Sequence, residues 1–208
     1  MYFRRVRKLD IPELIRQKLL QEWESGAVVP TSRSGPDHIA GSNFQLTVVA
    51  AYRPSAALEQ EIYAHYQDFL NLVPDEPKIF IKKILSGNRY IAPHSDKSQT
   101  ASIQCVIKTD TNVLTSWHEP DANVAHLYQT TGNTRYKNTK GIDKLPLGHS
   151  SMITSMRMAP WEMVLFDHNA FHSVEFIPNM ERVLFSIGFL NITETELEDI
   201  YDQWWTQQ

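Results

Sequence analysis

Hydrophobic residues recur at helical spacing in three segments of the chain. Asp10 and Glu13 stand at the spacing of a capping box, which predicts a first helix that begins at Asp10. The apolar face of this helix comprises Ile11, Leu14, Ile15, Leu19 and Trp23. The second helix is expected after Pro54-Ser55. Its apolar face comprises Leu58, Ile62, Tyr66 and Phe69. We expect both faces to pack against a core.

The last segment of the chain carries the third helical pattern. Thr193 and Glu196 form a second capping-box pair, so the helix is expected to start at Thr193. Its apolar face comprises Leu197, Ile200, Tyr201 and Trp204. Aromatic stripes at this spacing are typical of core packing.

Between the second and third helices, the pattern changes to short runs rich in β-branched and aromatic residues. Turn residues such as Ser86-Gly87-Asn88 separate the runs. The expected strands are 78–85, 100–108, 113–117, 124–129, 151–158, 163–167, 172–177 and 182–190. Because no helical pattern lies between them, the strands favour antiparallel sheets. The predicted fold is mainly β with flanking helices, a sandwich or a double-stranded barrel of the jelly-roll kind.

The expected jelly-roll core spans about residues 78–190 of a single domain, 1–208, with the N-terminal helices and the C-terminal helix packed on it. One polar stretch, 130–150, is too long for a hairpin turn. Such a stretch is a solvated loop, a lid or a binding loop.

Composition and charge exclude several classes of protein. Of the 208 residues 42% are hydrophobic, which is typical of a folded globular core rather than a disordered chain. The net charge of −4 argues against nucleic acid as a partner. No run is long enough to span a membrane, and the basic N-terminus lacks the apolar run of a secretory signal. We expect a cytoplasmic protein.

A single cysteine, Cys105, excludes a disulfide framework and any cluster of cysteine ligands. Its place within an apolar run indicates a small core residue rather than a nucleophile.

Two of the eight histidines lie in contexts that suggest metal binding. His94 and Asp96 stand two residues apart at the end of an extended run, so both side chains are expected on one face. His172 opens a later strand, where rigid backbone can aim its imidazole. His168, in the turn before it, is the rival ligand. Two histidines and one carboxylate on one side of an ion leave the opposite positions open, which suits Fe(II) that also binds cosubstrate and dioxygen.

Arg182 follows His172 by ten residues, inside an apolar run. Alternation along this run places Arg182, Leu184, Ser186 and Gly188 on one face. An arginine there is costly unless it pairs with an anion. If 178–181 form a hairpin turn, His172 and Arg182 lie roughly 16 Å apart. The imidazole, a five-carbon dicarboxylate that chelates the metal and the guanidinium arm could together span this gap. The alternative is a surface arginine at the edge of a hairpin.

The sequence His94-x-Asp96, the later His172 and then Arg182 resemble the signature of the Fe(II)- and 2-oxoglutarate-dependent dioxygenases. Pro93-His94-Ser95, and Phe166-Asp167 ahead of His172, look most like the aspartyl/asparaginyl β-hydroxylase and proline hydroxylase branch. The family's frequent Arg-x-Ser is absent, because Ser186 lies four residues beyond Arg182. Gly188 stands where the nucleic-acid demethylase branch places a second arginine.

The resemblance implies a double-stranded β-helix in which His94, Asp96 and His172 hold Fe(II), with no catalytic side chain beyond these ligands. 2-Oxoglutarate would chelate the iron and direct its far carboxylate to Arg182, with Ser186 and Tyr90 as further cosubstrate contacts. Dioxygen is the other cosubstrate.

The implied reaction is hydroxylation of a small molecule or of an amino-acid or peptide side chain. Asp167 is expected either to orient a ligand imidazole or to cap the turn before His172.

Two other hypotheses fit the sequence. A cupin-like metal-binding jelly roll, an isomerase or a small-ligand binding module, would use the same three ligands without oxygenase chemistry and without needing Arg182. An interaction protein would instead use the aromatic C-terminal helix, which ends in Trp204-Trp205, as a docking surface or homodimer interface.

Overall fold

The computed structural model describes residues 2–27, 29–33, 47–86, 90–96, 99–109, 113–125, 128–131, 134–138, 148–175 and 181–208. Its helices are α1 (Glu13–Ser25), α2 (Ala56–Leu70) and α3 (Glu194–Thr206), with a short 3-10 helix at Arg7–Leu9. The strands of the N-terminal half are β1 (Phe3–Arg5), β2 (Val29–Arg33), β3 (Thr47–Arg53), β4 (Lys78–Ser86), β5 (Tyr90–His94) and β6 (Ala101–Thr109). The later strands are β7 (Leu114–Pro120), β8 (Tyr128–Thr131), β9 (Thr134–Asn138), β10 (Ser150–Arg157), β11 (Val164–Asp167), β12 (Phe171–Glu175) and β13 (Glu181–Phe189).

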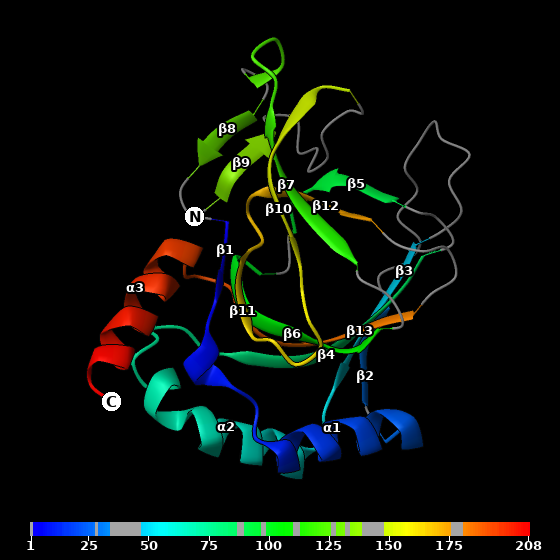
Figure 1. Ribbon diagram of the computed structural model, residues 1–208, viewed down its shortest axis with the longest axis vertical. Helices are drawn as coiled ribbons and strands as arrows, with labels where there is room; N and C mark the ends of the chain where they lie inside the picture. The colour runs from blue at the N-terminus through cyan, green and yellow to red at the C-terminus, as the bar shows by residue number, and fades with distance from the viewer. Residues whose placement is uncertain are drawn as a thin grey trace.

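Two antiparallel sheets face each other (Figure 1). The larger sheet has the strand order β1-β11-β6-β13-β4-β3-β2, and the smaller has the order β10-β7-β12-β5. From β4 to β7 and from β10 to β13 the chain passes back and forth between the sheets, so strands far apart in sequence become neighbours. This topology is a double-stranded β-helix, and it confirms the predicted jelly-roll fold with flanking helices.

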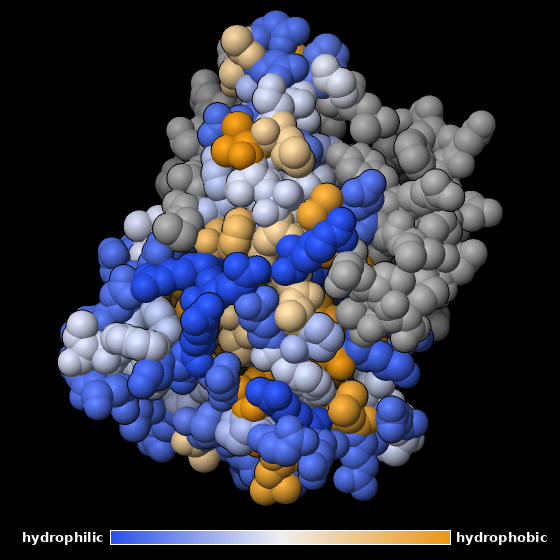
Figure 2. Space-filling view, viewed as in Figure 1, coloured by the Kyte–Doolittle hydropathy of each residue, from blue (hydrophilic) through white to orange (hydrophobic). Residues whose placement is uncertain are grey.

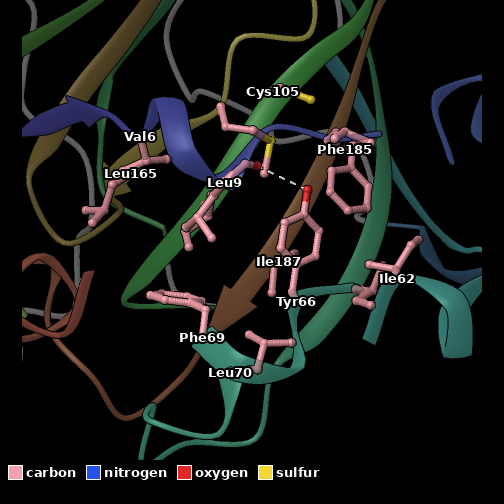
Figure 3. Close-up of a cluster of buried hydrophobic side chains, with 14 of the residues drawn as sticks. Val6, Leu9, Ile62, Tyr66, Phe69, Leu70, Cys105, Leu165, Phe185 and Ile187 are labelled. Atoms are coloured by element: carbon pink, nitrogen blue, oxygen red, sulfur yellow. Dashed lines mark hydrogen bonds between the residues drawn. The ribbon is translucent and has the colours of Figure 1, made fainter. Parts of the chain in front are cut away.

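The two faces of β13 serve two different cores. Val183, Phe185 and Ile187 point outward into a core that also contains Ile62, Tyr66 and Phe69 of α2. Figure 3 shows Phe185, Ile187 and the α2 side chains of this core around Tyr66. The Tyr66 hydroxyl donates a hydrogen bond to the carbonyl of Leu9 over 3.2 Å. Fully burying a side chain of this kind contributes about 1.5–3 kcal/mol. This packing holds α1 and α2 beneath the larger sheet (Figure 1).

The opposite face of β13 lines the space between the sheets. Leu184 packs there with Ile84 of β4, Val106 of β6, Phe166 of β11 and Trp117 of β7. The alternation predicted for residues 182–188 is therefore present, with Leu184 on the inner face and Val183 and Phe185 on the outer face.

The N-terminal strand β1 closes one edge of the barrel. It pairs with β11, and Phe3 stacks on Trp117 with ring centroids 4.9 Å apart. Arg4 points the other way and forms ion pairs with Asp202 at 2.6 Å and Glu198 at 3.1 Å on α3. The N-terminal segment is thus fixed between the barrel interior and the last helix.

The first helix does not begin at the predicted residue. α1 starts at Glu13, and its N-cap is Pro12, which provides no side-chain cap, so the capping box expected at Asp10 does not form. A residue before proline is sterically restrained from helical backbone, which keeps Ile11 outside the helix. With this start, Ile15 and Leu19 are buried, but Leu14 is 61% exposed and does not belong to the apolar face.

The second and third helices form as predicted. The Ser55 hydroxyl caps α2 by accepting from the Leu58 amide, and Thr193 and Glu196 form the capping box of α3. Trp204 packs edge-to-face on Phe69, at 5.8 Å between centroids, so much of the aromatic face expected to dock a partner is covered within the chain. Trp205 remains 41% exposed.

The interval between β7 and β10 differs from the prediction. Val124 lies in a turn, and its strand begins only at Tyr128. The stretch expected to be a loop contains β9, which pairs with β8 as a hairpin. Residues 132–133 and 139–147 of that stretch lie outside the described residues. The predicted strand list also lacked β1, β2, β3, β5 and β9, although the extended run that ends at His94 was expected.

The described surface is mostly polar. Figure 2 shows hydrophilic residues over most of the described part of one face, with hydrophobic residues in small separate groups. Among the described residues, no helix is both long and apolar enough to cross a membrane.

Candidate functional site

The end of β5 and the start of β12 bring the three predicted ligands together. His94 and His172 are direct cross-strand partners, and their ring centroids lie 4.5 Å apart. Asp96 follows β5 by two residues, with its Oδ1 3.7 Å from Nε2 of His94. One ligand atom from each of His94, Asp96 and His172 lies within 4.8 Å of the others. These atoms are within reach of one ion after small side-chain rotations.

The ring of His172 is held in one orientation. Its Nδ1 lies 3.0 Å from the carbonyl oxygen of Ala170, so Nδ1–H donates and Nε2 keeps its lone pair. Asp167 shapes the turn that carries Ala170, because its Oδ1 accepts from the amides of Asn169 at 2.9 Å and Ala170 at 3.2 Å. Of the two roles considered for Asp167, the structure shows the turn cap.

His168, the rival ligand, instead binds the carboxylate of Asp96. Its Nδ1 lies 2.5 Å from Asp96 Oδ2, and its Nε2 lies 2.7 Å from the Ser102 hydroxyl and 3.0 Å from the Gln99 amide. With Nδ1–H as donor, Nε2 accepts from these two groups, and every polar atom of the ring is satisfied. The other oxygen of Asp96 remains directed toward His94.

Burial and mutual contact set the protonation of the site. Burial raises the pKa of Asp96, but the hydrogen bond from His168 and the nearby imidazoles outweigh it and lower the pKa well below its usual value. Burial, together with repulsion from His94, lowers the pKa of His172 to about 3. A carboxylate and a neutral imidazole are the forms that ligate a divalent metal.

Arg182 lies at the start of β13 and is 3% exposed. Its Nη2 donates to the sulfur of Met158 over 3.2 Å, and among the residues the structure describes its Nε has no partner. No ion pair joins its guanidinium to a carboxylate within the described chain. Burial lowers the pKa of Arg182 to about 10, so the group remains a buried cation at neutral pH. Within the part of the chain that the structure describes, no anion therefore balances the charge of Arg182.

The two further cosubstrate candidates are placed differently. Ser186 is fully buried in β13, and its hydroxyl has no hydrogen-bond partner among the described residues. Tyr90 pairs through its backbone with Glu175 of β12, and its side chain lies outside the described residues.

Sequence reasoning missed Lys82. This residue lies on β4 opposite Leu184, and its charge acts on both Asp96 and His168. The signal was present in the sequence, because Lys82-Lys83 interrupts an apolar strand and alternation directs one of the two side chains inward.

The donor set fits a hard or borderline divalent ion. Two neutral imidazoles and one carboxylate suit Fe(II) and leave the side of the ion away from the protein ligands open. Behind the ligands lie Phe166, whose ring is edge-on to His172 at 5.0 Å, and the fully buried Trp117. These rings limit the access of water to the inner side of the site.

Solved structures similar to this chain include 2-oxoglutarate-dependent enzymes and prolyl hydroxylases, and also a vicilin from hazelnut (Corylus avellana). The non-heme α-ketoglutarate-dependent epimerase SnoN from nogalamycin biosynthesis matches at 10% identity and a TM-score of 0.50, over 90% of this chain and 78% of SnoN. A prolyl-4-hydroxylase from Pseudomonas putida matches at 11% identity and a TM-score of 0.42, over 90% of this chain and 91% of that one. A Trichoplax adhaerens prolyl hydroxylase bound to a peptide fragment of hypoxia inducible factor matches at 9% identity and a TM-score of 0.44. The match covers 97% of this chain and 85% of that one.

No protein-family model matches the sequence, and a search of the curated proteins finds no significant match. At such low identity, the match to SnoN establishes the fold alone.

Proposed function

We propose that this protein is an Fe(II)- and 2-oxoglutarate-dependent dioxygenase that hydroxylates a small molecule or an amino-acid or peptide side chain. The observation that carries the proposal is the convergence of His94, Asp96 and His172, with ligand atoms within 4.8 Å of one another, at one end of a double-stranded β-helix. This arrangement, with Arg182 buried in the same barrel, matches the signature identified in the sequence.

Different residues of the site would bind the metal and the cosubstrate. His94, Asp96 and His172 would hold Fe(II), and the buried Arg182 would bind the far carboxylate of 2-oxoglutarate. The hydroxyl of Ser186 has no hydrogen-bond partner among the described residues. It lies on the same face of β13, between Arg182 and the metal end of the strand, and would donate a further hydrogen bond. Bound Fe(II) supplies coordination positions at which 2-oxoglutarate and dioxygen react to hydroxylate a C–H bond, with succinate and carbon dioxide released.

Arg182 separates this function from that of a metal-binding jelly roll without oxygenase chemistry. A protein that only binds a metal gains nothing from an inward-facing guanidinium that is 3% exposed and has no carboxylate partner among the described residues. Burying such a charge is costly unless an anionic ligand compensates it. The guanidinium therefore favours a carboxylate cosubstrate.

The proposed substrate is a small molecule, an amino acid or a peptide rather than nucleic acid. A net charge of −4 offers no general attraction for a phosphate backbone. A homodimer remains a prediction, for which the exposed Trp205 on α3 is the feature to test.

The test is the thermal midpoint of the metal-free protein with Mn(II), with 2-oxoglutarate and with both, beside the same series for His172→Ala. A ligand at 100 times its Kd stabilises by about 2.7 kcal/mol, which raises Tm by about 5 to 10 °C for a domain of this size. We expect 2-oxoglutarate to raise Tm only when Mn(II) is present, and we expect no such rise in His172→Ala. A shift with Mn(II) alone would identify a metal-binding jelly roll, and no shift at all would refute the metal site.

A further inference from the structure

Lys82 is a second cation that faces the barrel interior. Along β4, Ile79 and Ile81 belong to the outer core, whereas Ile84 belongs to the inner one, so alternation directs Lys82 inward. The neighbouring Lys83 faces outward, where its Nζ forms an ion pair with Glu181 at 2.8 Å. The influence of Lys82 on Asp96 and His168 agrees with this inward direction.

The charge of Lys82 is not compensated within the described chain. Among the residues that the structure describes, no carboxylate forms an ion pair or hydrogen bond with its ammonium group. Burial lowers the pKa of Lys82, and the attraction of Asp96 only partly opposes this. Asp96 already accepts from His168, and its remaining oxygen belongs to the proposed metal site. Among the described residues, the ammonium group of Lys82 therefore lacks a compensating carboxylate, as does the guanidinium of Arg182.

Strand register places Lys82 between Arg182 and the metal centre. Arg182 pairs with Ile84, and Leu184 pairs with Lys82, so Lys82 lies two residues farther along toward the end of β13. At that end Gly188 pairs with Ser102, whose hydroxyl contacts His168 beside Asp96. One strand spacing and two residues of rise put the Cα atoms of Lys82 and Arg182 about 8 Å apart. The barrel thus presents two cations in line with the metal site.

We propose that Lys82 binds the carboxylate at the keto-acid end of 2-oxoglutarate, beside the metal, while Arg182 binds the carboxylate at the other end. This inference rests on the proposed function and adds a residue to it. A dianion with one carboxylate at each end compensates both inward-facing cations, which a monoanion cannot do. Lys82 is thereby a cosubstrate-binding residue that selects dicarboxylic keto acids together with Arg182.

The experiment measures equilibrium binding of two ligands by calorimetry to the Mn(II)-loaded protein without oxygen. 2-Oxoglutarate has both carboxylates, and 2-oxopentanoate keeps only the keto-acid end. Lys82→Met removes the charge with nearly the same shape, and Lys82→Gln is a second neutral variant. Lys83→Met is the matched control, because it removes the same charge from the next position on the outer face of β4.

Lys82→Met is expected to weaken both ligands by about 10- to 100-fold, the usual cost of losing a charge-assisted hydrogen bond. Arg182→Met is expected to weaken 2-oxoglutarate alone, and Lys83→Met to weaken neither ligand. Lys82→Arg, which retains the charge, is expected to recover part of the affinity.

Unchanged affinity for both ligands in Lys82→Met and Lys82→Gln would overturn the inference. A loss confined to 2-oxoglutarate would also overturn it, because it would assign Lys82 to the far carboxylate. If the wild-type protein with Mn(II) binds neither ligand, the proposed function itself fails, and the inference fails with it. The wild-type measurement therefore distinguishes the two failures.

Discussion

Nδ1 of His168 lies 2.5 Å from Oδ2 of Asp96, and the carbonyl of His168 also accepts from the Asp96 amide over 2.9 Å. The two residues are thus joined through side chain and backbone. His168 fixes the carboxylate at one oxygen and leaves the other directed toward His94. It acts on the proposed metal through Asp96, as a positioning residue.

Removing the His168 imidazole is expected to weaken Mn(II) binding by about 10- to 100-fold, the usual effect of losing a group that orients a metal ligand. The measurement is the Kd for Mn(II) of His168→Ala by calorimetry. His168→Asn keeps an N–H donor near the position of Nδ1 and is expected to recover part of the affinity. Equal affinities in the wild-type protein and His168→Ala would show that the hydrogen bond has no role in metal binding.

The stability of the metal-free protein is expected to fall on mild acidification. Burial lowers the pKa values of His118, His168 and His172. In the unfolded chain these imidazoles bind protons near pH 6.5, whereas in the folded protein they do so only at lower pH. Their contribution is therefore present above pH 6.5 and is lost as pH falls toward the folded pKa, by up to about 1.4 kcal/mol per pH unit for each group.

His118 tests this dependence outside the proposed metal centre. It lies on the outer face of the smaller sheet, where its Nε2 is 2.7 Å from the Ser173 hydroxyl. The free energy of unfolding of His118→Asn, measured by urea titration between pH 5 and 7, is expected to vary less steeply with pH than that of the wild-type protein. Parallel curves would contradict the prediction.

A methyl group at position 188 is expected to disturb the support of Asp96. A Cβ added to Gly188 would overlap Oε1 of Gln99, whose amide nitrogen contacts His168. Gly188→Ala should therefore lower the free energy of unfolding by about 1–3 kcal/mol, the range of overpacking substitutions. In a Gln99→Ala background the same substitution should cost much less. If Gly188→Ala lowers the free energy of unfolding equally in the wild-type protein and in Gln99→Ala, the strain does not come from contact with Gln99.

Cys105 is expected to resist alkylation in the folded protein. Its side chain is fully buried in β6, and burial raises the pKa of the thiol, which disfavours the reactive thiolate. Mass spectrometry after iodoacetamide treatment should show no adduct without denaturant and one adduct in guanidinium chloride. Rapid modification of the native protein would mean that β6 opens readily.

Much of the fold could be predicted because it depends on local patterns. Alternation located the strands of the jelly roll except β5, and the capping residues of α2 and α3 located those helices. The start of α1 was wrong because a capping-box spacing at Asp10 was weighed above the restraint that Pro12 places on the preceding residue. β9 escaped detection, and the strand expected at 124–129 overlaps β8 only in part, because both strands of this hairpin are short and polar.

The site was only partly predictable, for a different reason. The spacing of His94, Asp96 and His172 suggested a metal site, and the structure brings these residues together. The contacts of His168 could not be read from the sequence, since Asp96 and Ser102 are 72 and 66 residues away along the chain. Lys82 escaped notice because its importance depends on the register between β4 and β13.

The division of β13 between two cores makes the length of the segment between β12 and β13 more critical than its composition. Val183, Phe185 and Ile187 anchor the helices, while Arg182, Leu184 and Ser186 line the barrel. An insertion or deletion of one residue that shifts the strand by one position would send the guanidinium into the hydrophobic layer and the phenylalanine into the barrel. We therefore expect relatives of this protein to accept many substitutions along β13. We do not expect them to accept an insertion or deletion of an odd number of residues that shifts the register of this strand.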